Sequence, residues 1–275
     1  MPDYARLLDD IAEAAREAGE RILQIVRRGF EIETKKDASP VTEADHAAEL
    51  IILAALARVA PGVPVVAEEE VAAGRFPILG ETYFLVDPLD GTKEFVGGGH
   101  DYTVNIGLIE QGTPTLGIVY APAAGLLFGG CPGIGAWSDT GAGRHAIKTR
   151  PRGDDVVAVA SKSHLNQATI DYLAEAVGAC SYMGIGSSLK FCIIAQGQAD
   201  IYPRASPTSE WDTAAGHAVL MAAGGIVDGP DGAALRYGKS AFLNRGFVAT
   251  AGWKAPALKR FLEPFAGSVD LPHGP

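Results

Sequence analysis

Cysteine is scarce in this sequence, with Cys131, Cys180 and Cys192 the only three among 275 residues. Their number is odd, and no two lie at the spacing of a metal or redox motif. We therefore expect small buried thiols and no disulfide framework. The histidines show no HxxxH or HExxH pattern, so the sequence predicts no zinc site.

Positive charge is also in short supply. Lys and Arg number 23 against 33 Asp and Glu, which leaves a formal net charge of −10. This balance argues against the basic surface with which proteins bind a nucleic-acid polymer. An acidic protein that acts on an anionic substrate needs a local source of positive charge, and a bound metal ion is the natural one.

Long hydrophobic runs are missing as well. No stretch of about 18 apolar residues occurs, so we expect no membrane span. The first 26 residues are amphipathic and charged throughout, and they lack the apolar region of a signal peptide. We expect a cytoplasmic location, with peripheral association with the inner membrane left open.

Hydrophobic residues nevertheless make up 47% of the chain, enough for one large domain or two tightly packed subdomains. The pattern changes character at residues 150–155 (RPRGDD). We predict an α+β subdomain over 1–150 and an α/β subdomain over 151–275. Sheets layered between pairs of helices are expected to connect them.

Apolar periodicity predicts the individual elements. Thr42 is a plausible N-cap, with Asp45 three residues later as in a capping box. Strands at 102–112 and 113–122 are expected to pair antiparallel through a turn at Gln111–Gly112. The predicted helices span 4–28, 47–60, 166–178, 187–197 and 211–225, and further strands lie at 83–86, 156–161, 199–204, 226–227 and 247–250.

The densest chemical signal is DPLDGT (87–92), which follows the apolar strand YFLV. A buried carboxylate costs several kcal/mol unless it is paired or bound to a metal, yet Asp87 and Asp90 stand at the strand's end. Pro88 restricts the backbone, and Gly91 removes a side chain where backbone must approach something closely. The alternative is an ordinary Asp-rich turn.

Other acids occupy similar places. Glu68 opens a run of three glutamates after the apolar stem VPVVA, and Asp212 opens a helix rich in Ala and Gly. The alternatives are a solvated charge run for the glutamates and a simple N-cap for Asp212 or Asp45. Taken together, several acidic tips suit Mg²⁺, which prefers oxygen ligands. Such a site is suited to phosphoryl transfer to water.

At these residues the sequence resembles the inositol monophosphatase superfamily. Within that superfamily it is similar to the bacterial 3′(2′),5′-bisphosphate nucleotidases of the CysQ type. The similarity extends in order along nearly the whole chain, and its fold implies a five-layered αβαβα sandwich of mixed α/β class. The motifs that carry it are KxDxSPVTEAD (35–45), AEEE (67–70), DPLDGTKEF (87–95), TVNIGLI (103–109), GSSLKF (186–191), YPR (202–204) and WDTAAGHAV (211–219).

The resemblance implies a ligand set for two or three Mg²⁺ ions. Four of its members, all except Asp87, would also contact the substrate. The ligands would be Glu68, Asp87, the backbone carbonyl of Leu89, Asp90 and Asp212.

It also implies catalytic roles. Glu68 and Thr92 would orient and deprotonate the attacking water, while Asp45 and Asp37 would support the water or an additional metal. Gly91 and Thr92 would hold the scissile phosphate through backbone N–H groups and the hydroxyl.

For nucleotide recognition the resemblance implies Ser187, Lys190, Arg204 and His164, because Lys and Arg can bind a second phosphate. Each has a plainer interpretation. Lys190 could be a surface charge on its helix, Arg204 could pair with an acid, and His164 could cap a helix.

The implied reaction converts adenosine 3′,5′-bisphosphate and water to AMP and phosphate, in sulfur assimilation, with inhibition by Li⁺. The partner would be this small molecule, and a homodimer is left open. The GGGHD loop (97–101) and a short 70–83 segment depart from the family pattern and bear on substrate preference. Alternatives are inositol monophosphatase or fructose-1,6-bisphosphatase activity on the same scaffold, a non-catalytic metal or phosphate sensor, and a folding Ca²⁺ site.

Overall fold

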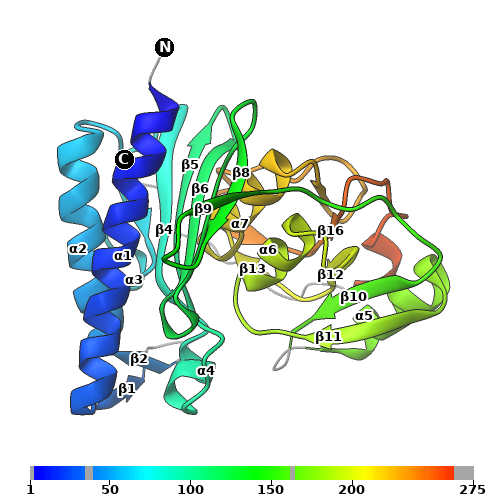
Figure 1. Ribbon diagram of the computed structural model, residues 1–275, viewed down its shortest axis with the longest axis horizontal. Coiled ribbons are helices and arrows are strands. Elements are labelled where there is room, and N and C mark those ends of the chain that lie inside the picture. The colour runs from blue at the N-terminus through cyan, green and yellow to red at the C-terminus, as the bar shows by residue number, and fades with distance from the viewer. Residues whose placement is uncertain (1–2, 35–39, 162–164, 263–275) are drawn as a thin grey trace.

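The computed structural model of the chain describes residues 3–34, 40–161 and 165–262, and Figure 1 shows helices and sheets alternating across the molecule. Two residues predicted to belong to the site, Asp37 and His164, lie outside the described residues.

Two helices near the N-terminus lie side by side. α1 (Tyr4–Arg28) matches its predicted range, and its regularly spaced apolar side chains are buried on one face. α2 (Glu43–Val59) begins four residues before its predicted start, directly after the cap that Thr42 provides. The Asp45 carboxylate accepts the Thr42 backbone N–H at 2.8 Å, which completes the predicted capping box.

The first sheet has seven strands within the described part of the chain, in the spatial order β3-β4-β5-β6-β7-β8-β9. β3 pairs parallel with β4, and all other neighbours are antiparallel. Gln111 and Gly112 join β5 to β6 with φ angles of 50° and 71°, which confirms the predicted turn. The strands are β3 (Val65–Ala67), β4 (Thr82–Asp90), β5 (Thr103–Glu110), β6 (Thr113–Ala121), β7 (Leu126–Cys131), β8 (Gly135–Asp139) and β9 (Arg144–Ile147).

The structure corrects two boundaries near the predicted acidic site. DPLD does not interrupt the strand, because β4 continues to Asp90 with a register shift between Asp87 and Asp90. Only at Thr92 does a short helix, α4 (Thr92–Val96), begin. Glu68 likewise does not end a strand but opens α3 (Glu68–Ala72). β4 continues beyond its apolar residues because it remains paired with β5 as far as Asp90.

The second sheet has five strands among the described residues, in the order β11-β10-β12-β16-β14. β10 is parallel to β11 and β12, whereas β16 is antiparallel to β12 and β14. The strands are β10 (Val156–Ala160), β11 (Cys180–Gly184), β12 (Ile201–Arg204), β14 (Ile226–Asp228) and β16 (Phe247–Thr250). Two small pairings are β1 (Ile32–Thr34) with β2 (Pro40–Thr42), and β13 (Thr208–Ser209) with β15 (Leu243–Asn244).

The later helices are shorter than their predicted ranges. The predicted 166–178 helix divides into an α-helical turn and a π-helical turn, and the other two end before their glycines. They are α5 (Gln167–Tyr172) with η2 (Leu173–Val177), α6 (Leu189–Ala195) and α7 (Trp211–Ala222); 3₁₀ turns lie at η1 (Pro122–Ala124) and η3 (Lys259–Phe261).

Three hydrophobic clusters show how these elements are layered. One joins α1 and α2 to a face of the first sheet. The second fills the space between the two sheets and contains α6 and α7. The third packs α5 and η3 on the far face of the second sheet. The order is therefore α, β, α, β, α, as Figure 1 shows from α2 to α5, which confirms the predicted five-layered sandwich.

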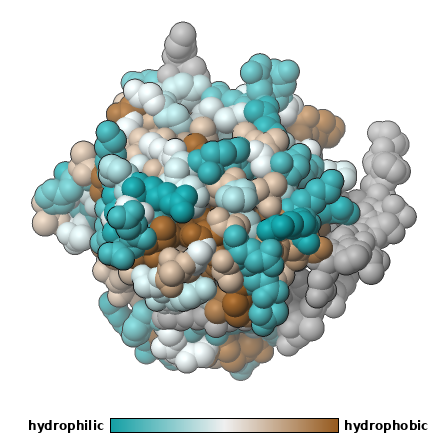
Figure 2. All heavy atoms as spheres, turned by 90° about the vertical axis from the view of Figure 1, so that its right-hand side faces the viewer, coloured by the Kyte–Doolittle hydropathy of each residue, from teal (hydrophilic) through white to brown (hydrophobic). Residues whose placement is uncertain are grey.

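None of the helices in the described ranges is long and apolar enough to cross a membrane. Figure 2 shows the side of the molecule that bears β11 and α5, where apolar surface is interspersed with hydrophilic side chains.

α7 lies directly on a floor of glycines in the first sheet. A Cβ added at Gly117 would lie 2.3 Å from the Ala215 carbonyl oxygen, and one added at Gly130 would lie 2.6 Å from the Val219 Cα. The small residues of α7 therefore pack closely against the sheet. This contact brings the N-terminal turn of α7, which carries Asp212, beside the ends of β4 and β5.

Replacing Gly117 with Ala is expected to force α7 off the sheet. We expect a loss of about 2 kcal/mol in the free energy of unfolding, measured by urea denaturation, because overpacking a tight core costs energy of this order. Gly80→Ala is the matched control, since no atom lies within 4 Å of the added methyl group, and it should change stability by less than about 0.5 kcal/mol. Equal effects of the two substitutions would contradict this account of the contact.

Candidate active site

A cavity of about 360 Å³ lies between the two sheets. It is formed by α3, the β4–α4 turn, β12, and the N-terminal parts of α6 and α7. Residues from both halves of the chain therefore meet at one place. The predicted site residues that line it are Glu68, Asp90, Gly91, Thr92, Ser187, Lys190, Arg204 and Asp212.

The turn after β4 places backbone and side-chain oxygens close together. Leu89 is buried; its N–H donates to Asp87 Oδ1 at 3.0 Å, and its carbonyl accepts the Thr92 hydroxyl at 3.0 Å. Gly91 has φ +92°, and a Cβ there would lie 2.8 Å from the Asp101 carbonyl. Only glycine fits both the backbone conformation and this close approach.

Asp45 supports this turn from α2. Its Oδ2 accepts hydrogen bonds from the Thr42 N–H and hydroxyl, each at 2.8 Å. Its Oδ1 lies 3.3 Å from the Thr92 hydroxyl. The predicted role beside Thr92 and the plainer role in the cap are thus compatible, because each carboxylate oxygen serves one of them.

Asp90 and Asp212 approach the cavity from different elements. Asp90 Oδ2 accepts the Ser188 N–H at 2.6 Å, and Asp212 Oδ2 accepts the Ser209 N–H at 2.9 Å. Burial raises the pKa of Asp90 to about 6, although Lys190 opposes this. Burial, followed by the charges of Asp90 and Glu68, raises the pKa of Asp212 well above its usual range.

The chemistry of this donor set fits a hard cation, because like charges are partly buried around one cavity and a cation would relieve their repulsion. Throughout 3–34, 40–161 and 165–262, however, no three acidic, histidine or cysteine side chains already lie close enough to hold a metal ion. The predicted ligand assignment stays a prediction.

Of the predicted recognition residues within the described ranges, Ser187 lies in the loop before α6, Lys190 in the first turn of α6 and Arg204 at the end of β12. Ser187 adopts φ +49°, an unusual conformation for a residue with a side chain, and lines the cavity. Lys190 is only 3% exposed, so its interpretation as a surface charge is wrong. Its Nζ donates to the carbonyls of Ile185, at 3.3 Å, and Ser187. Lys190 thus holds its own loop, and burial lowers its pKa to about 8.

Arg204 and Tyr202, which both belong to β12, line the same cavity. Among the hydrogen bonds of the described residues, the buried Nε of Arg204 has no partner. The Lys190 ammonium lies 5.2 Å from the centre of the Tyr202 ring. The cavity therefore combines acids with the buried Lys190 and the half-buried Arg204, and basic groups of this kind suit an anion with more than one charge.

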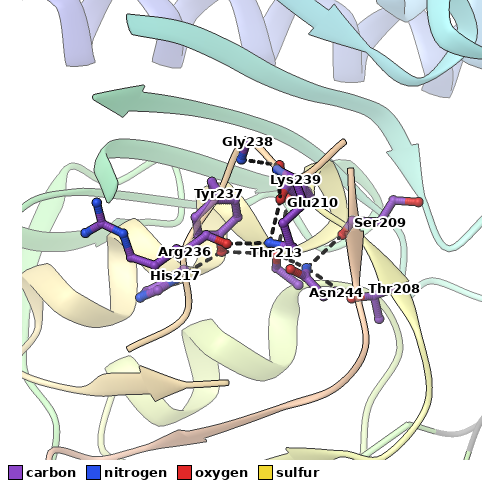
Figure 3. A network of polar contacts seen from close by, with 10 residues as sticks. All are labelled: Thr208, Ser209, Glu210, Thr213, His217, Arg236, Tyr237, Gly238, Lys239 and Asn244. Carbon is purple, nitrogen blue, oxygen red and sulfur yellow. Dashed lines mark hydrogen bonds and ion pairs between the residues drawn. The ribbon is translucent and has the colours of Figure 1, made fainter. Parts of the chain in front are cut away.

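A polar network behind the cavity holds the N-terminal turn of α7 (Figure 3). Glu210 is fully buried and accepts the N–H groups of Gly238, at 2.8 Å, and Lys239, at 3.1 Å. The Lys239 ammonium lies 2.5 Å from the same carboxylate. Glu210 therefore anchors the 237–239 segment directly beneath the turn that carries Asp212.

The second arm of the network converges on Thr213. Its hydroxyl oxygen accepts hydrogen bonds from Tyr237, at 3.1 Å, and from the amide of Asn244, at 3.0 Å. Asn244 also donates to the Ser209 carbonyl, and His217 Nδ1 lies 3.0 Å from the Tyr237 hydroxyl. Figure 3 shows the contacts of Tyr237 and Asn244 with Thr213, and His217 beside Tyr237. Ser209, whose N–H holds Asp212, is thereby restrained.

Several residues of the site carry no sequence prediction. Ser188 lines the cavity beside the predicted Ser187, and Asn105 is a fully buried amide in an otherwise apolar strand motif, which was the available signal. Asp101 belongs to the GGGHD loop and accepts the Gly186 N–H at 3.0 Å. The GGGHD loop (97–101) thus contacts the loop before α6, which carries Ser187. Glu210 gave no distinguishing pattern.

Comparison with known proteins places this geometry in a family context. Residues 3–263 match the inositol monophosphatase family. A 3′(2′),5′-bisphosphate nucleotidase CysQ of Salmonella typhimurium is 43% identical, with coverage of 89% of this chain and 99% of that protein. The Escherichia coli protein of the same name is 42% identical over 88% of this chain and 98% of its own length.

Solved structures agree. CysQ from Bacteroides thetaiotaomicron, described as a bacterial member of the inositol monophosphatase family, superposes with a TM-score of 0.77 at 35% identity, covering 91% of this chain and 99% of that one. An inositol monophosphatase from Anabaena gives a TM-score of 0.74 at 28% identity over 91% and 92% of the two chains.

The buried His217 predicts a pH dependence of stability. Burial, and then the charge of Lys239, lowers its pKa from 6.5 to about 3. The unfolded chain therefore binds a proton below pH 6.5 that the folded chain does not, so stability falls as pH drops toward 3. Between pH 6.5 and 5 this contribution amounts to about 2 kcal/mol.

Urea unfolding of the wild type and of His217→Gln at pH 7, 6 and 5 measures this contribution. The stability difference between the two proteins should shift in favour of the variant as pH falls, since other titrating groups are common to both. A difference that is constant from pH 7 to pH 5 would rule out a buried neutral His217.

Proposed function

Since the chain belongs to the inositol monophosphatase family, we propose that it is a Mg²⁺-dependent 3′(2′),5′-bisphosphate nucleotidase. It would hydrolyse the 3′-phosphate of adenosine 3′,5′-bisphosphate to AMP and phosphate, in sulfur assimilation in the cytoplasm. The observation that carries the proposal is one cavity lined both by the acids Glu68, Asp90 and Asp212 and by Lys190 and Arg204. Relatives named for this activity support it at 42–43% identity.

Two or three Mg²⁺ ions would be held by the side chains of Glu68, Asp87, Asp90 and Asp212 and by the Leu89 carbonyl. When bound, the metal supplies charge for the scissile phosphate and lowers the pKa of water. Asp87 and Leu89 are already oriented by their mutual hydrogen bond of 3.0 Å. The Ser188 and Ser209 N–H groups orient Asp90 and Asp212 in the same way.

Thr92 and Glu68 would orient the attacking water. The Thr92 hydroxyl lies within hydrogen-bond distance of both the Asp45 carboxylate and the Leu89 carbonyl, so its single proton is used there. Its oxygen lone pairs can then accept a hydrogen bond from water, and Glu68 would take the proton. Asp37, outside the described residues, remains a prediction for supporting the water or an additional metal.

The phosphates would be bound by different groups. Gly91 and Thr92 would donate backbone N–H groups to the scissile phosphate at the first turn of α4, where helical N–H groups lack intrahelical partners. Ser187, Lys190 and Arg204 would contact the second phosphate and the nucleoside, together with His164. These two binding regions correspond to the proposed subdomains, residues 1–150 and 151–275.

Inositol monophosphatase or fructose-1,6-bisphosphatase activity is the alternative on the same scaffold. An inositol monophosphatase 3 of Solanum lycopersicum is 32% identical over 82% of this chain and 87% of its own length. The metal ligands do not separate these substrates. The buried Lys190 and the half-buried Arg204, which both line the cavity, favour a substrate with a second phosphate.

The test compares phosphate release from adenosine 3′,5′-bisphosphate, inositol 1-phosphate and fructose 1,6-bisphosphate, with Mg²⁺, in the presence and absence of Li⁺. We expect kcat/KM to favour the nucleotide by at least about a hundredfold, or about 2.7 kcal/mol of transition-state binding. Li⁺ should inhibit. Equal or better turnover of inositol 1-phosphate or fructose 1,6-bisphosphate would contradict the nucleotidase proposal and favour inositol monophosphatase or fructose-1,6-bisphosphatase activity.

Asp90→Asn should abolish turnover in the same assay with the fold intact by circular dichroism, because it removes charge but not volume from the metal site. Asp171→Asn, the same change on the exposed side of α5, is the matched control and should retain full activity. Activity of Asp90→Asn near that of the wild type would refute the carboxylate site.

Arg204→Ala should raise KM for adenosine 3′,5′-bisphosphate by at least about tenfold, since hydrogen bonds to a charged group contribute about 1.5–3 kcal/mol. KM for inositol 1-phosphate should change little. Arg6→Ala, which truncates a side chain that is 81% exposed, is the control. Equal losses on both substrates would show that Arg204 is structural.

A further inference from the structure

Two polar side chains interrupt the apolar core beside the candidate metal site. Thr103 and Asn105 lie in β5, and neither is exposed to solvent. They stand two residues apart, hence on one face of the sheet, and they pair in register with Asp90 and Asp87. Burying an amide and a hydroxyl is costly unless both are hydrogen-bonded, so their partners reveal their use.

The partner of both is Ser188 at the start of α6. The Ser188 hydroxyl donates to Asn105 Oδ1 at 2.7 Å, and Thr103 Oγ1 lies 2.9 Å from the same hydroxyl oxygen. Since the Ser188 proton is committed to Asn105, the Thr103 hydroxyl is the donor to Ser188. The Asn105 amide group then faces Asp90 Oδ2, at 3.5 Å.

Every donor in this chain of hydrogen bonds therefore points toward Asp90. The Ser188 backbone adds a second, shorter contact, because its N–H donates to the same Asp90 oxygen at 2.6 Å. One residue of the second half of the chain thus holds the proposed ligand Asp90 both directly and through Asn105.

Ser188 also belongs to the loop that carries the proposed nucleotide contacts. Ser187, in its unusual φ +49° conformation, immediately precedes it, and Lys190 follows two residues later. Lys190 ties that loop together through the Ile185 and Ser187 carbonyls. A shift of the loop would therefore move the groups that orient Asp90, and the reverse holds as well.

We propose that Thr103, Asn105 and Ser188 form a positioning relay through which nucleotide binding at the 185–190 loop and Mg²⁺ binding at Asp90 strengthen each other. The relay rests on the proposed function for the identity of both ligands. Thr103 and Asn105 act through Asp90 and Ser188, and their contribution is the orientation of those two groups. By linkage, the strengthening is equal in both directions.

Calorimetric titration of the full-length chain with Mg²⁺ tests the relay, with and without saturating AMP. AMP is the right probe because it has the nucleoside and 5′-phosphate but lacks the 3′-phosphate that would bridge directly to the metal. In the wild type, AMP should tighten Mg²⁺ binding by about fivefold or more, since coupling between sites is typically of that size.

Ser188→Ala and Thr103→Val remove hydroxyls from the relay with little change in volume. Ser188→Ala should weaken Mg²⁺ binding by about tenfold, as loss of a group that orients a metal ligand does, and should reduce the AMP effect to less than about twofold. Thr103→Val should weaken Mg²⁺ binding and the AMP effect by smaller amounts, because the Thr103 hydroxyl is one hydrogen bond further from Asp90 than the Ser188 hydroxyl.

Thr250→Val is the control. It removes an equally buried hydroxyl, bonded to the Trp253 carbonyl at 2.6 Å, from β16. Both Mg²⁺ affinity and the AMP effect should match those of the wild type, even where the thermal midpoint falls. Equal losses in the control, or wild-type affinity and coupling in Ser188→Ala, would overturn the relay.

The outcomes separate the relay from the function. If the wild type neither hydrolyses adenosine 3′,5′-bisphosphate nor binds AMP, the proposed nucleotidase activity fails. The Mg²⁺ titrations without AMP still decide whether Ser188 and Thr103 position Asp90. If hydrolysis and AMP binding are found but AMP leaves Mg²⁺ affinity unchanged in the wild type, the activity stands and the relay fails.

Discussion

The grouping of several partly buried carboxylates around one cavity is the constraint on which the rest of this structure depends. Burial raises the pKa of both Asp90 and Asp212; the charges of Asp90 and Glu68 raise the pKa of Asp212 further, and the charge of Glu68 does the same for Asp90. Protein groups offset part of this cost, because each aspartate receives a backbone N–H from the other side of the cavity or the preceding turn. The remainder suits a bound cation, which is the role proposed for these acids.

The packing of α6 and α7 between the two sheets brings these groups together. α7 sits against glycines of the first sheet, and its N-terminal turn is secured from below by Glu210 and Thr213. α6 packs beside α7, and Ser188 at its start is hydrogen-bonded to Asn105 of β5. The N-terminal turn of α7 and the loop before α6 therefore both lie against the ends of β4 and β5.

Much of the fold follows from local pattern. The period of apolar residues located α1, the Thr42–Asp45 pair identified the N-cap of α2 although the predicted helix range began four residues late, and Gln111–Gly112 located a hairpin, because each depends on neighbours in sequence. The end of β4 was misjudged for the opposite reason. Hydrophobicity stops at Val86, yet pairing with β5 continues to Asp90, and only the partner strand decides that.

For the site, the sequence by itself determined which acids and which basic residues stand in recognisable motifs, and hence the family and the class of reaction they suit. It did not determine that Lys190 is buried or that Ser188 and Asn105 support Asp90. Ser188 and Asp90 are 98 residues apart, and their hydrogen bond exists only because α6 packs between the two sheets. Tertiary structure alone decided these contacts, since burial and hydrogen-bond partners are properties of the packed chain and not of any short segment of it.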